Sequence, residues 1–319
     1  MSKGFEKRKR IFEKFVSQLQ IMNDNELLPE FVSYSEGSYI CPICLNQFTE
    51  KDLNEESDNM LTLEDAPPKS LGGKANTLTC KRCNNKCGHD IDYHLTERLI
   101  ELDIREFLPN TKSQASFTSN GVTIKGELIV DSNKVMTVLF DQKNNHPEKF
   151  EKFIKTAGKD DVTDLAFKRS RVEKHRLEVA LLKTAYILAF EQFGYSLILS
   201  RPYDIVREQL LNPGLELYPE GFWTKQNSFK KEHEGVHLIV TQGFEGFQAV
   251  FSLKAISSEK RFGVYLPISI KTTTEVIKRF KKQKGGFALE MHSLSMNDYF
   301  EDFENIKLMI DYLKIINTP

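Results

Sequence analysis

Cysteine is scarce in this chain, and all five cysteines lie between Cys41 and Cys87. This clustering argues against disulfides that staple the whole chain and favours a local metal-binding segment. The basic N-terminus is followed by an amphipathic stretch rather than by an apolar signal region. We therefore expect a cytoplasmic protein whose thiols stay reduced.

The chain also lacks an excess of positive charge and lacks long apolar runs. Its formal net charge is −1, so it does not coat nucleic acid indiscriminately, and any contact with nucleic acid must be local. The longest uncharged apolar run of its main helix extends only from Thr184 to Phe190, whereas about 20 residues are needed to span a bilayer. We expect no membrane-spanning segment. After residue 110 we also find no nucleotide-binding loop, no internal repeat and no Ser-His-Asp residue order of the kind that serine hydrolases use.

What the chain does contain is a pair of Cys-x-x-Cys motifs. A tight turn that carries cysteines three residues apart presents two sulfurs to one ion, and two such turns complete the tetrahedral shell that zinc prefers. The sequence therefore predicts a structural Zn²⁺ site, with Cys87 free or merely buried. The predicted ligands are Cys41, Cys44, Cys80 and Cys83. Two disulfides, or four unrelated buried cysteines, are the alternative.

The segment between and after these motifs carries further signals. It reads Glu64-Asp-Ala-Pro-Pro-Lys-Ser-Leu-Gly-Gly73, then Asn84 directly after the last predicted ligand, then a Gly-x-x-x-Asp run from Gly88 to Asp92. This combination resembles the HNH endonuclease family in its four-cysteine branch. The resemblance covers residues 41–92 of the 319.

The resemblance implies a ββα-metal fold, in which a hairpin and a short helix hold one catalytic Mg²⁺ or Mn²⁺ and the zinc site acts as a brace. Glu64 and Asn84 match the ligands of the catalytic metal, and Asn76 matches the family's middle asparagine. Asp65 stands where the family has its general-base histidine. An exposed carboxylate accepts a proton poorly near neutral pH.

Proton transfer therefore needs another candidate if the centre is active. Asp65 itself, the nearby His89 or His94, or metal-bound water could accept the proton. Otherwise catalysis is lost. The favoured interpretation of both histidines is that they lie on the solvated face of the following helix.

The rest of the chain predicts an α+β fold. It consists of a small zinc-braced ββα-metal (HNH-like) domain followed by a larger domain of antiparallel sheet and helices. The expected parts are an N-terminal amphipathic helix with its lead-in (1–36), the zinc-binding domain (37–110) and a target-recognition or partner domain (111–319). Expected elements are helices at about 5–20 and 167–193, an antiparallel meander at 113–140, and strands at 195–200, 237–241, 247–254 and 262–268.

Basic residues in both predicted domains are candidates for phosphate contacts, although scattered solvated charge is an equal alternative. In the zinc-binding domain they are Lys69, Lys74, Lys81, Arg82 and Lys86. In the second domain they are Arg169, Arg171, Lys278 and Arg279, with Lys168, Lys174, Lys281 and Lys282 beside them.

The leading functional hypothesis is a metal-dependent HNH-type endonuclease that hydrolyses phosphodiester bonds in nucleic acid, expected to be DNA. A role in restriction or phage defence is implied by the resemblance alone. The alternative is a catalytically inactive, zinc-stabilised module that binds nucleic acid or a protein partner. A third hypothesis is an interaction protein that never meets nucleic acid. Self-association into a homo-oligomer is a further option for the partner.

Overall fold

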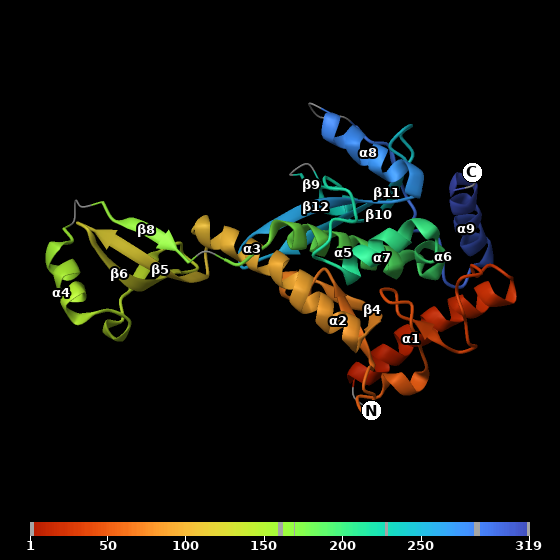
Figure 1. The fold of residues 1–319 in the computed structure, drawn as a ribbon, viewed down its shortest axis with the longest axis horizontal. Helices are drawn as coiled ribbons and strands as arrows, with labels where there is room; N and C mark the ends of the chain where they lie inside the picture. Colours follow the sequence, from red (N-terminus) through yellow and green to blue (C-terminus); the bar gives the residue numbers. More distant parts are fainter. Residues whose placement is uncertain (1–2, 159–161, 169, 227–228, 284–287, 318–319) are drawn as a thin grey trace. The chain divides into compact units, whose positions relative to one another are not determined.

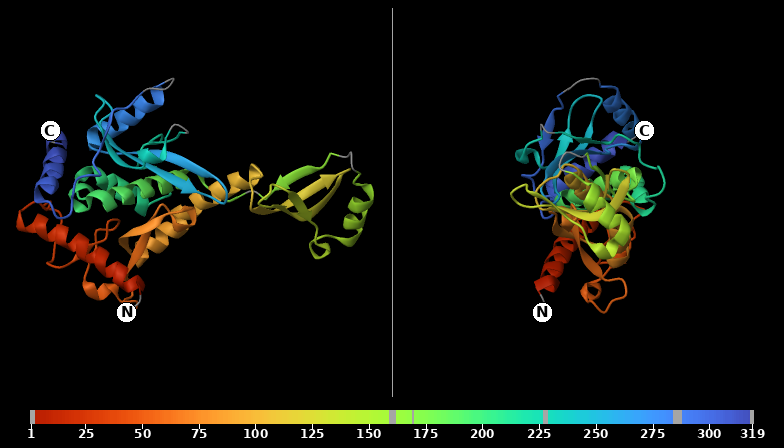
Figure 2. Two further views of the ribbon diagram at one scale, coloured as in Figure 1. Left: turned by 180° about the vertical axis from the view of Figure 1, so that it is seen from behind. Right: turned by 90° about the vertical axis from the view of Figure 1, so that its left-hand side faces the viewer.

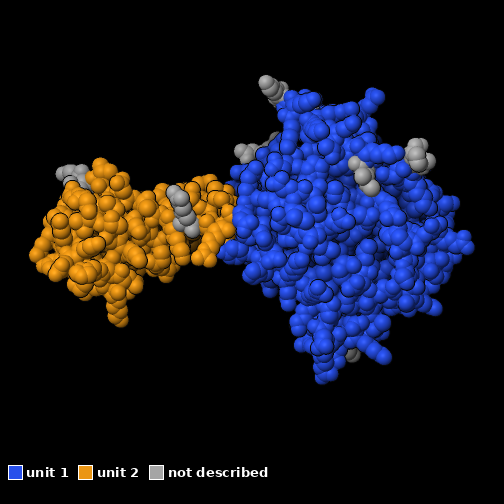
Figure 3. Space-filling model, viewed as in Figure 1, with its two compact units in different colours: residues 1–95, 173–253, 260–319 blue, residues 96–172, 254–259 orange. Residues whose placement is uncertain are grey.

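The computed structural model describes residues 3–158, 162–168, 170–226, 229–283 and 288–317 (Figure 1). The chain forms two compact units, coloured separately in Figure 3. Unit 1 comprises residues 1–95, 173–253 and 260–319, and unit 2 comprises residues 96–172 and 254–259. This division differs from the expected boundaries after residues 36 and 110. The chain leaves unit 1 after residue 95, builds a separate core, and returns at residue 173 to pack on the segment with the cysteines. Local sequence patterns cannot show such a return.

Unit 1 begins with the predicted amphipathic helix. It buries Phe12, Phe15 and Leu19, whose spacing places them on one face. The first elements are α1 (Lys3–Asp24), β1 (Tyr39–Ile40), β2 (Gln47–Phe48), β3 (Leu61–Ala66), β4 (Lys74–Cys80) and α2 (Lys81–Cys87), followed by a π-helical turn at Gly88–Asp92. The next helix, α3 (Tyr93–Arg105), begins in unit 1 and continues into unit 2. β1 pairs with β2 and β3 with β4, both antiparallel.

Helix α5 (Lys174–Phe193) is the centre of unit 1. It is apolar nearly all round, as expected for a helix buried on every side. It contacts both the β3–β4 hairpin and strand β10 (Gly235–Ile239), and Figures 1 and 2 show it between them. The helix was expected to begin near residue 167. It begins at Lys174 instead, because residues 164–167 form strand β8, which pairs with β5. It ends at Gly194, whose φ of 60° favours glycine.

The strand expected at residues 195–200 is wrong. Residues Tyr195–Ile198 form helix α6, followed by α7 (Asp204–Leu211). Tyr195, Leu197 and Ile198 are all buried, and a short apolar run buried on every side looks the same in sequence whether it is helix or strand.

The remaining strands of unit 1 form one antiparallel sheet in the order β13-β10-β11-β12-β9. Its other members are β9 (Trp223–Lys225), β11 (Gly246–Lys254), β12 (Glu259–Leu266) and β13 (Met291–Ser293). Helix α8 (Ile270–Lys282) connects β12 to β13, and helix α9 (Phe303–Asn317) follows β13. The strands predicted at 237–241, 247–254 and 262–268 are confirmed to within a few residues.

Unit 2 is a four-stranded antiparallel sheet in the order β7-β6-β5-β8, with helix α4 (Pro147–Thr156) packed on it. Its strands are β5 (Thr111–Ser119), β6 (Val122–Val130), β7 (Met136–Leu139) and β8 (Asp164–Phe167). The Asn120–Gly121 turn has φ values of 48° and 74°, as the hairpin prediction required. Phe117, Ile124 and Phe153 lie in its core. The protein is thus a mixed α+β chain with antiparallel sheets, and none of the helices described here is long and apolar enough to cross a membrane.

Candidate metal centre

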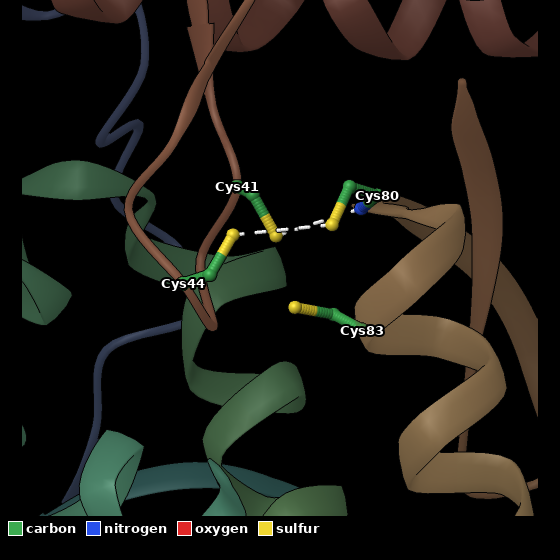
Figure 4. Close-up of side chains that lie close together, drawn as sticks. All are labelled: Cys41, Cys44, Cys80 and Cys83. Atoms are coloured by element: carbon green, nitrogen blue, oxygen red, sulfur yellow. Dashed lines mark hydrogen bonds between the residues drawn. The ribbon is translucent and has the colours of Figure 1, made fainter. Parts of the chain in front are cut away.

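The four predicted ligands converge from two local structures, as Figure 4 shows. Cys41 and Cys44 lie in the turn after β1, where the Leu45 amide donates to the Cys41 carbonyl oxygen. Cys80 ends β4, and Cys83 lies one helical turn later in α2. Each Cys-x-x-Cys pair therefore directs two sulfurs to one side.

The distances between the sulfurs fit one metal ion. The Sγ atoms of Cys44 and Cys80 are 3.9 Å apart, and all four Sγ atoms lie within 4.8 Å of one another. Zinc–sulfur bonds of about 2.3 Å in a tetrahedron place sulfurs about 3.8 Å apart. All five cysteines are free thiols, so no disulfide is formed, and this cluster could hold a metal ion.

The thiols of this cluster influence one another. The pKa of the Cys80 thiol is lowered, chiefly by its hydrogen bond with Cys41, whereas burial raises the pKa of Cys41. Cys87 is outside the cluster and buried, and burial raises its pKa to about 12. A thiol with such a pKa stays protonated at neutral pH, so Cys87 is an unreactive part of the core.

The β3–β4 hairpin carries the Glu64–Gly73 motif. Its two glycines are required for steric reasons. Gly72 has a φ of 89°, and a Cβ on Gly73 would lie 1.5 Å from the carbonyl oxygen of Pro67. The hairpin register shifts between Glu64 and Asp65. The two acidic neighbours differ in burial, because Glu64 is buried and Asp65 is half-buried.

Glu64 is buried, with an exposed fraction of 2%. Its Oε1 atom lies 2.6 Å from the Nζ of Lys183, and its Oε2 atom accepts a hydrogen bond of 2.7 Å from Thr79. The same ammonium lies 2.5 Å from the Oδ2 of Asp92. One cation from α5 therefore bridges two carboxylates, one from the β3–β4 hairpin and one from the turn after α2.

Burial and charge compete within this cluster. Burial alone would lower the pKa of Lys183, but the charges of Glu64 and Asp92 outweigh it and hold that pKa above its usual range. Burial raises the pKa of Asp92 to about 6, although Lys183 opposes the shift. The second oxygen of Asp92, Oδ1, is buried and has no hydrogen-bond partner in the part of the chain that the structure describes. Lys183 thus stays charged. Both carboxylate oxygens of Glu64 have a polar partner among the described residues, whereas only one oxygen of Asp92 does.

Asp65 is less buried than Glu64 but still interacts with the charges of Glu64 and Lys183, whereas Asn76 lies at the surface. Burial and Glu64 raise the pKa of the Asp65 carboxyl, and the nearby cations Lys69 and Lys7 partly offset the effect. The side-chain amide of Asn76 is exposed and donates a hydrogen bond of 2.7 Å to Glu191 on α5. Asn76 therefore ties the hairpin to α5.

The other two expected catalytic residues also have different surroundings. The Asn84 amide donates hydrogen bonds of 2.9 Å to the Thr62 hydroxyl and to the Leu63 carbonyl oxygen, which fasten α2 to β3. His89 has a side chain that is 90% exposed and lies 2.8 Å from Asp90. His94 is buried and accepts a hydrogen bond from the Glu173 amide, and burial lowers its pKa. Apart from the four cysteines, the described residues include no group of three or more His, Cys, Asp and Glu side chains placed to hold a metal ion.

The predicted basic residues are exposed but dispersed. Lys69 and Lys74 lie where β3 turns into β4, while Lys81 and Arg82 open α2 at the other end of the hairpin and Lys86 bonds to the Leu211 carbonyl oxygen. Two further lysines of α1, Lys7 and Lys14, join Lys74 in lowering the pKa of Glu191, which burial raises. The lysines at the hairpin turn and those of α1 therefore act on the same acidic side chains, Asp65 and Glu191.

The basic residues of the predicted second domain are also spread over the structure. Lys168 and Arg171 lie outside any helix, and Arg171 belongs to unit 2, whereas Lys174 pairs with Glu178. On α8, Arg279 donates to the Gly243 carbonyl oxygen, and Lys278, Lys281 and Lys282 are exposed. Arg169 lies outside the described residues.

Sequence reasoning missed Lys183. The available signal was a lysine inside an otherwise apolar helical run, Leu181-Leu-Lys-Thr-Ala185. A buried lysine needs a carboxylate partner, so this position indicated a buried ion pair, although not which acids form it.

Comparisons of the chain with models of known families, with curated proteins and with solved structures each found no match.

Proposed function

We propose that this protein binds nucleic acid through a zinc-braced, HNH-like hairpin and helix, and that the centre at Glu64 does not hydrolyse it. The observation that carries the proposal is the position of Lys183. HNH-type hydrolysis needs a divalent cation on the acidic ligand, in contact with the scissile phosphate. Here the ligand position already holds an ammonium group 2.6 Å away, inside the protein.

A second cation at this place would be strongly disfavoured. A divalent ion on Glu64 would lie beside the positive charge of Lys183 and repel it in a region of low dielectric. A phosphate group would also have to reach a carboxylate that is 2% exposed. The Lys183 ammonium thus takes over the charge-neutralising role of a metal without supplying its Lewis acidity.

The zinc ion has a structural role in this proposal. Four thiolates fill the tetrahedral shell and leave no open position for water or substrate. The ion would fasten the turn after β1 to the start of α2 and so fix the hairpin between them.

Nucleic acid is the favoured partner because of the cations at the hairpin turn. Lys69, Lys74 and Lys7 are exposed or half-exposed and lie near the acidic side chains Asp65 and Glu191. A local group of lysines in a chain with a net charge of −1 fits contacts with a few phosphates rather than coating of a long duplex.

A metal-dependent nuclease is the second candidate, and Asp65 is the observation that favours it. Burial and Glu64 raise the pKa of this carboxyl, and a carboxylate with a raised pKa accepts a proton more readily near neutral pH. In that case Mg²⁺ or Mn²⁺ would have to bind outside the Glu64–Lys183 pair.

Titration of DNA against the zinc-loaded protein over a range of salt concentrations tests the proposal. The double variant Lys69→Gln/Lys74→Gln should bind every sequence about tenfold more weakly and should lower the salt slope by roughly two. The matched control is Lys271→Gln/Lys307→Gln, which changes the net charge equally at exposed positions on α8 and α9 and should bind as the parent does.

The same preparations separate the two candidates. Incubation with plasmid DNA and Mg²⁺ or Mn²⁺ should produce no nicking. Nicking that disappears in Asp65→Ala would establish the nuclease instead. Equal affinity of both double variants for DNA would refute the assigned binding surface.

A further inference from the structure

A cavity of about 850 Å³ lies in unit 1 between α8 and one face of the five-stranded sheet. Figure 1 shows α8 alongside this sheet, and the Phe280 ring of α8 lies 5.7 Å from the Tyr265 ring of β12. The volume is within the range of sites that hold small molecules. The cavity shares no residue with the cysteine cluster or with the Glu64–Lys183 pair.

A glycine shapes the floor of this cavity. Gly263 lies in the middle of β12, and a Cβ there would be 2.3 Å from the Nε2 of Gln248 and 2.8 Å from the ring of Phe229. The absence of a side chain therefore lets an amide and an aromatic ring meet at one point. Glycine inside a strand often marks such a close approach.

Gln248 is the most deeply buried polar side chain of the cavity, whose lining also includes the more exposed Thr224, Gln226, Lys281 and Gln283. Gln248 is 6% exposed, and its backbone pairs with His237 across β10 and β11. Its carboxamide makes no hydrogen bond with any residue that the structure describes, yet it lines the cavity. A buried amide without a partner is costly. The side chain therefore presents a donor and an acceptor, side by side, to whatever fills the cavity.

The walls around this amide are aromatic. The rings of Phe229, Tyr265 and Phe280 line the cavity. The Tyr265 hydroxyl is already used, because it donates to the Glu245 carbonyl oxygen, so the ring offers only apolar surface. Such a cavity suits a flat ring that stacks on aromatic side chains and needs one pair of hydrogen bonds at its edge.

From this geometry we infer that the cavity binds a single nucleobase, with adenine preferred. Glutamine forms two hydrogen bonds with the N6 and N7 atoms of adenine, because the amide oxygen accepts from N6 and the amide nitrogen donates to N7. Aromatic side chains stack on any base and hold it in place. The base could belong to a free nucleotide or to an unstacked position in a strand. The second source rests on the proposed function.

The only tryptophan of the chain provides a local reporter. Trp223 lines the same cavity, so its fluorescence reports on occupancy there. Titration of the full-length protein with adenosine should change this fluorescence and saturate, while cytidine and uridine should bind at least about tenfold more weakly because they lack the N6–N7 edge. Equilibrium dialysis with labelled adenosine gives the affinity independently.

Two variants test the amide. Gln248→Leu keeps the volume but removes both hydrogen bonds, and it should weaken adenosine binding by about tenfold or more. Gly263→Ala should have a similar effect, because the added methyl group displaces the amide. Gln114→Leu, an exposed glutamine in unit 2, should bind adenosine as the parent does. Melting curves show whether each variant is folded.

The inference fails if no nucleoside binds saturably, or if folded Gln248→Leu binds adenosine as tightly as the parent. Competition between adenosine and a single-stranded oligo(dA) assigns the base to a strand, whereas binding of AMP without such competition assigns it to a free nucleotide. The Lys69→Gln/Lys74→Gln variant should still bind adenosine fully. If adenosine binds and DNA does not, the cavity assignment stands and the proposed function fails.

Discussion

The four-cysteine cluster and the Glu64–Lys183–Asp92 cluster lie in the same hairpin–helix segment but are built in different ways. All four sulfurs come from two short turns, each fixed by local backbone geometry. The charge cluster takes its acids from the hairpin and the turn after α2 and its cation from α5, far along the sequence. Each pair of sulfurs in the first centre is therefore fixed locally, although the two pairs come together across 36 residues, whereas no part of the second centre forms before the tertiary fold.

The two clusters also differ in where their positive charge comes from. Thiolates crowded within 4.8 Å of one another repel one another and need an external cation. The carboxylates of Glu64 and Asp92 already have Lys183. Removal of metal should therefore damage the first centre and spare the second, and the predictions below test this contrast.

The largest expected effect is at the cysteines. Cys44→Ala should lose the zinc ion that we propose and most of the soluble protein, because apparent binding free energies of structural zinc reach about 10–16 kcal/mol in small domains. Cys87→Ala is the matched control. It removes a buried thiol outside the cluster and should keep a full equivalent of zinc in elemental analysis. Zinc retention in folded Cys44→Ala would exclude the four-thiolate site.

The next largest effect is at Lys183. Lys183→Met keeps the length of the side chain but leaves two buried carboxylates without their cation, which should lower the free energy of unfolding by about 3–5 kcal/mol. Urea denaturation measures this loss, and elemental analysis should still find zinc. The double variant Glu64→Gln/Lys183→Met should recover part of the loss. A folding stability of Lys183→Met equal to that of the parent would show that the pair contributes nothing.

The same contrast explains how much could be predicted from the sequence. Each Cys-x-x-Cys pair, helix α1 and the β5–β6 hairpin depend on residues close in the chain, such as Asn120–Gly121, and spacing was enough to find them. The partner of Glu64 could not be found this way, because nothing local links Lys183 to residue 64. The division into two units and the helix at residues 195–198 likewise depend on which surfaces become buried.

A smaller change in stability is expected at Asn84, and it distinguishes a structural role of this residue from a role as a metal ligand. Its amide donates to Thr62 and to the Leu63 carbonyl oxygen, so Asn84→Ala should lower the free energy of unfolding by roughly 1–2 kcal/mol. Asn84→Asp should be at least as harmful, because a carboxylate would face that carbonyl oxygen. A ligand of Mg²⁺ or Mn²⁺ would behave in the opposite way, since aspartate is a good ligand for both ions. Calorimetric titration with Mn²⁺ completes the comparison.

The smallest effect concerns the pH dependence that Asp92 brings to the charge cluster. Its pKa is about 6 in the folded protein and about 3.9 in an unfolded chain. Between these values the folded state binds a proton that the unfolded state does not, so stability is highest at low pH and falls as the pH rises through 6. From pH 5 to pH 7 this contribution should fall by roughly 1 kcal/mol.

The variant Asp92→Asn isolates this contribution, because it lacks the titrating group. Both proteins keep the same four cysteines, so the pH dependence of zinc binding cancels when their free energies of unfolding are subtracted. The free energy of unfolding of the parent, minus that of Asp92→Asn, should therefore decrease over this range in urea denaturation. A difference that stays constant, or that increases with pH, would mean that Lys183 keeps Asp92 ionised throughout and that the cluster is fully paired.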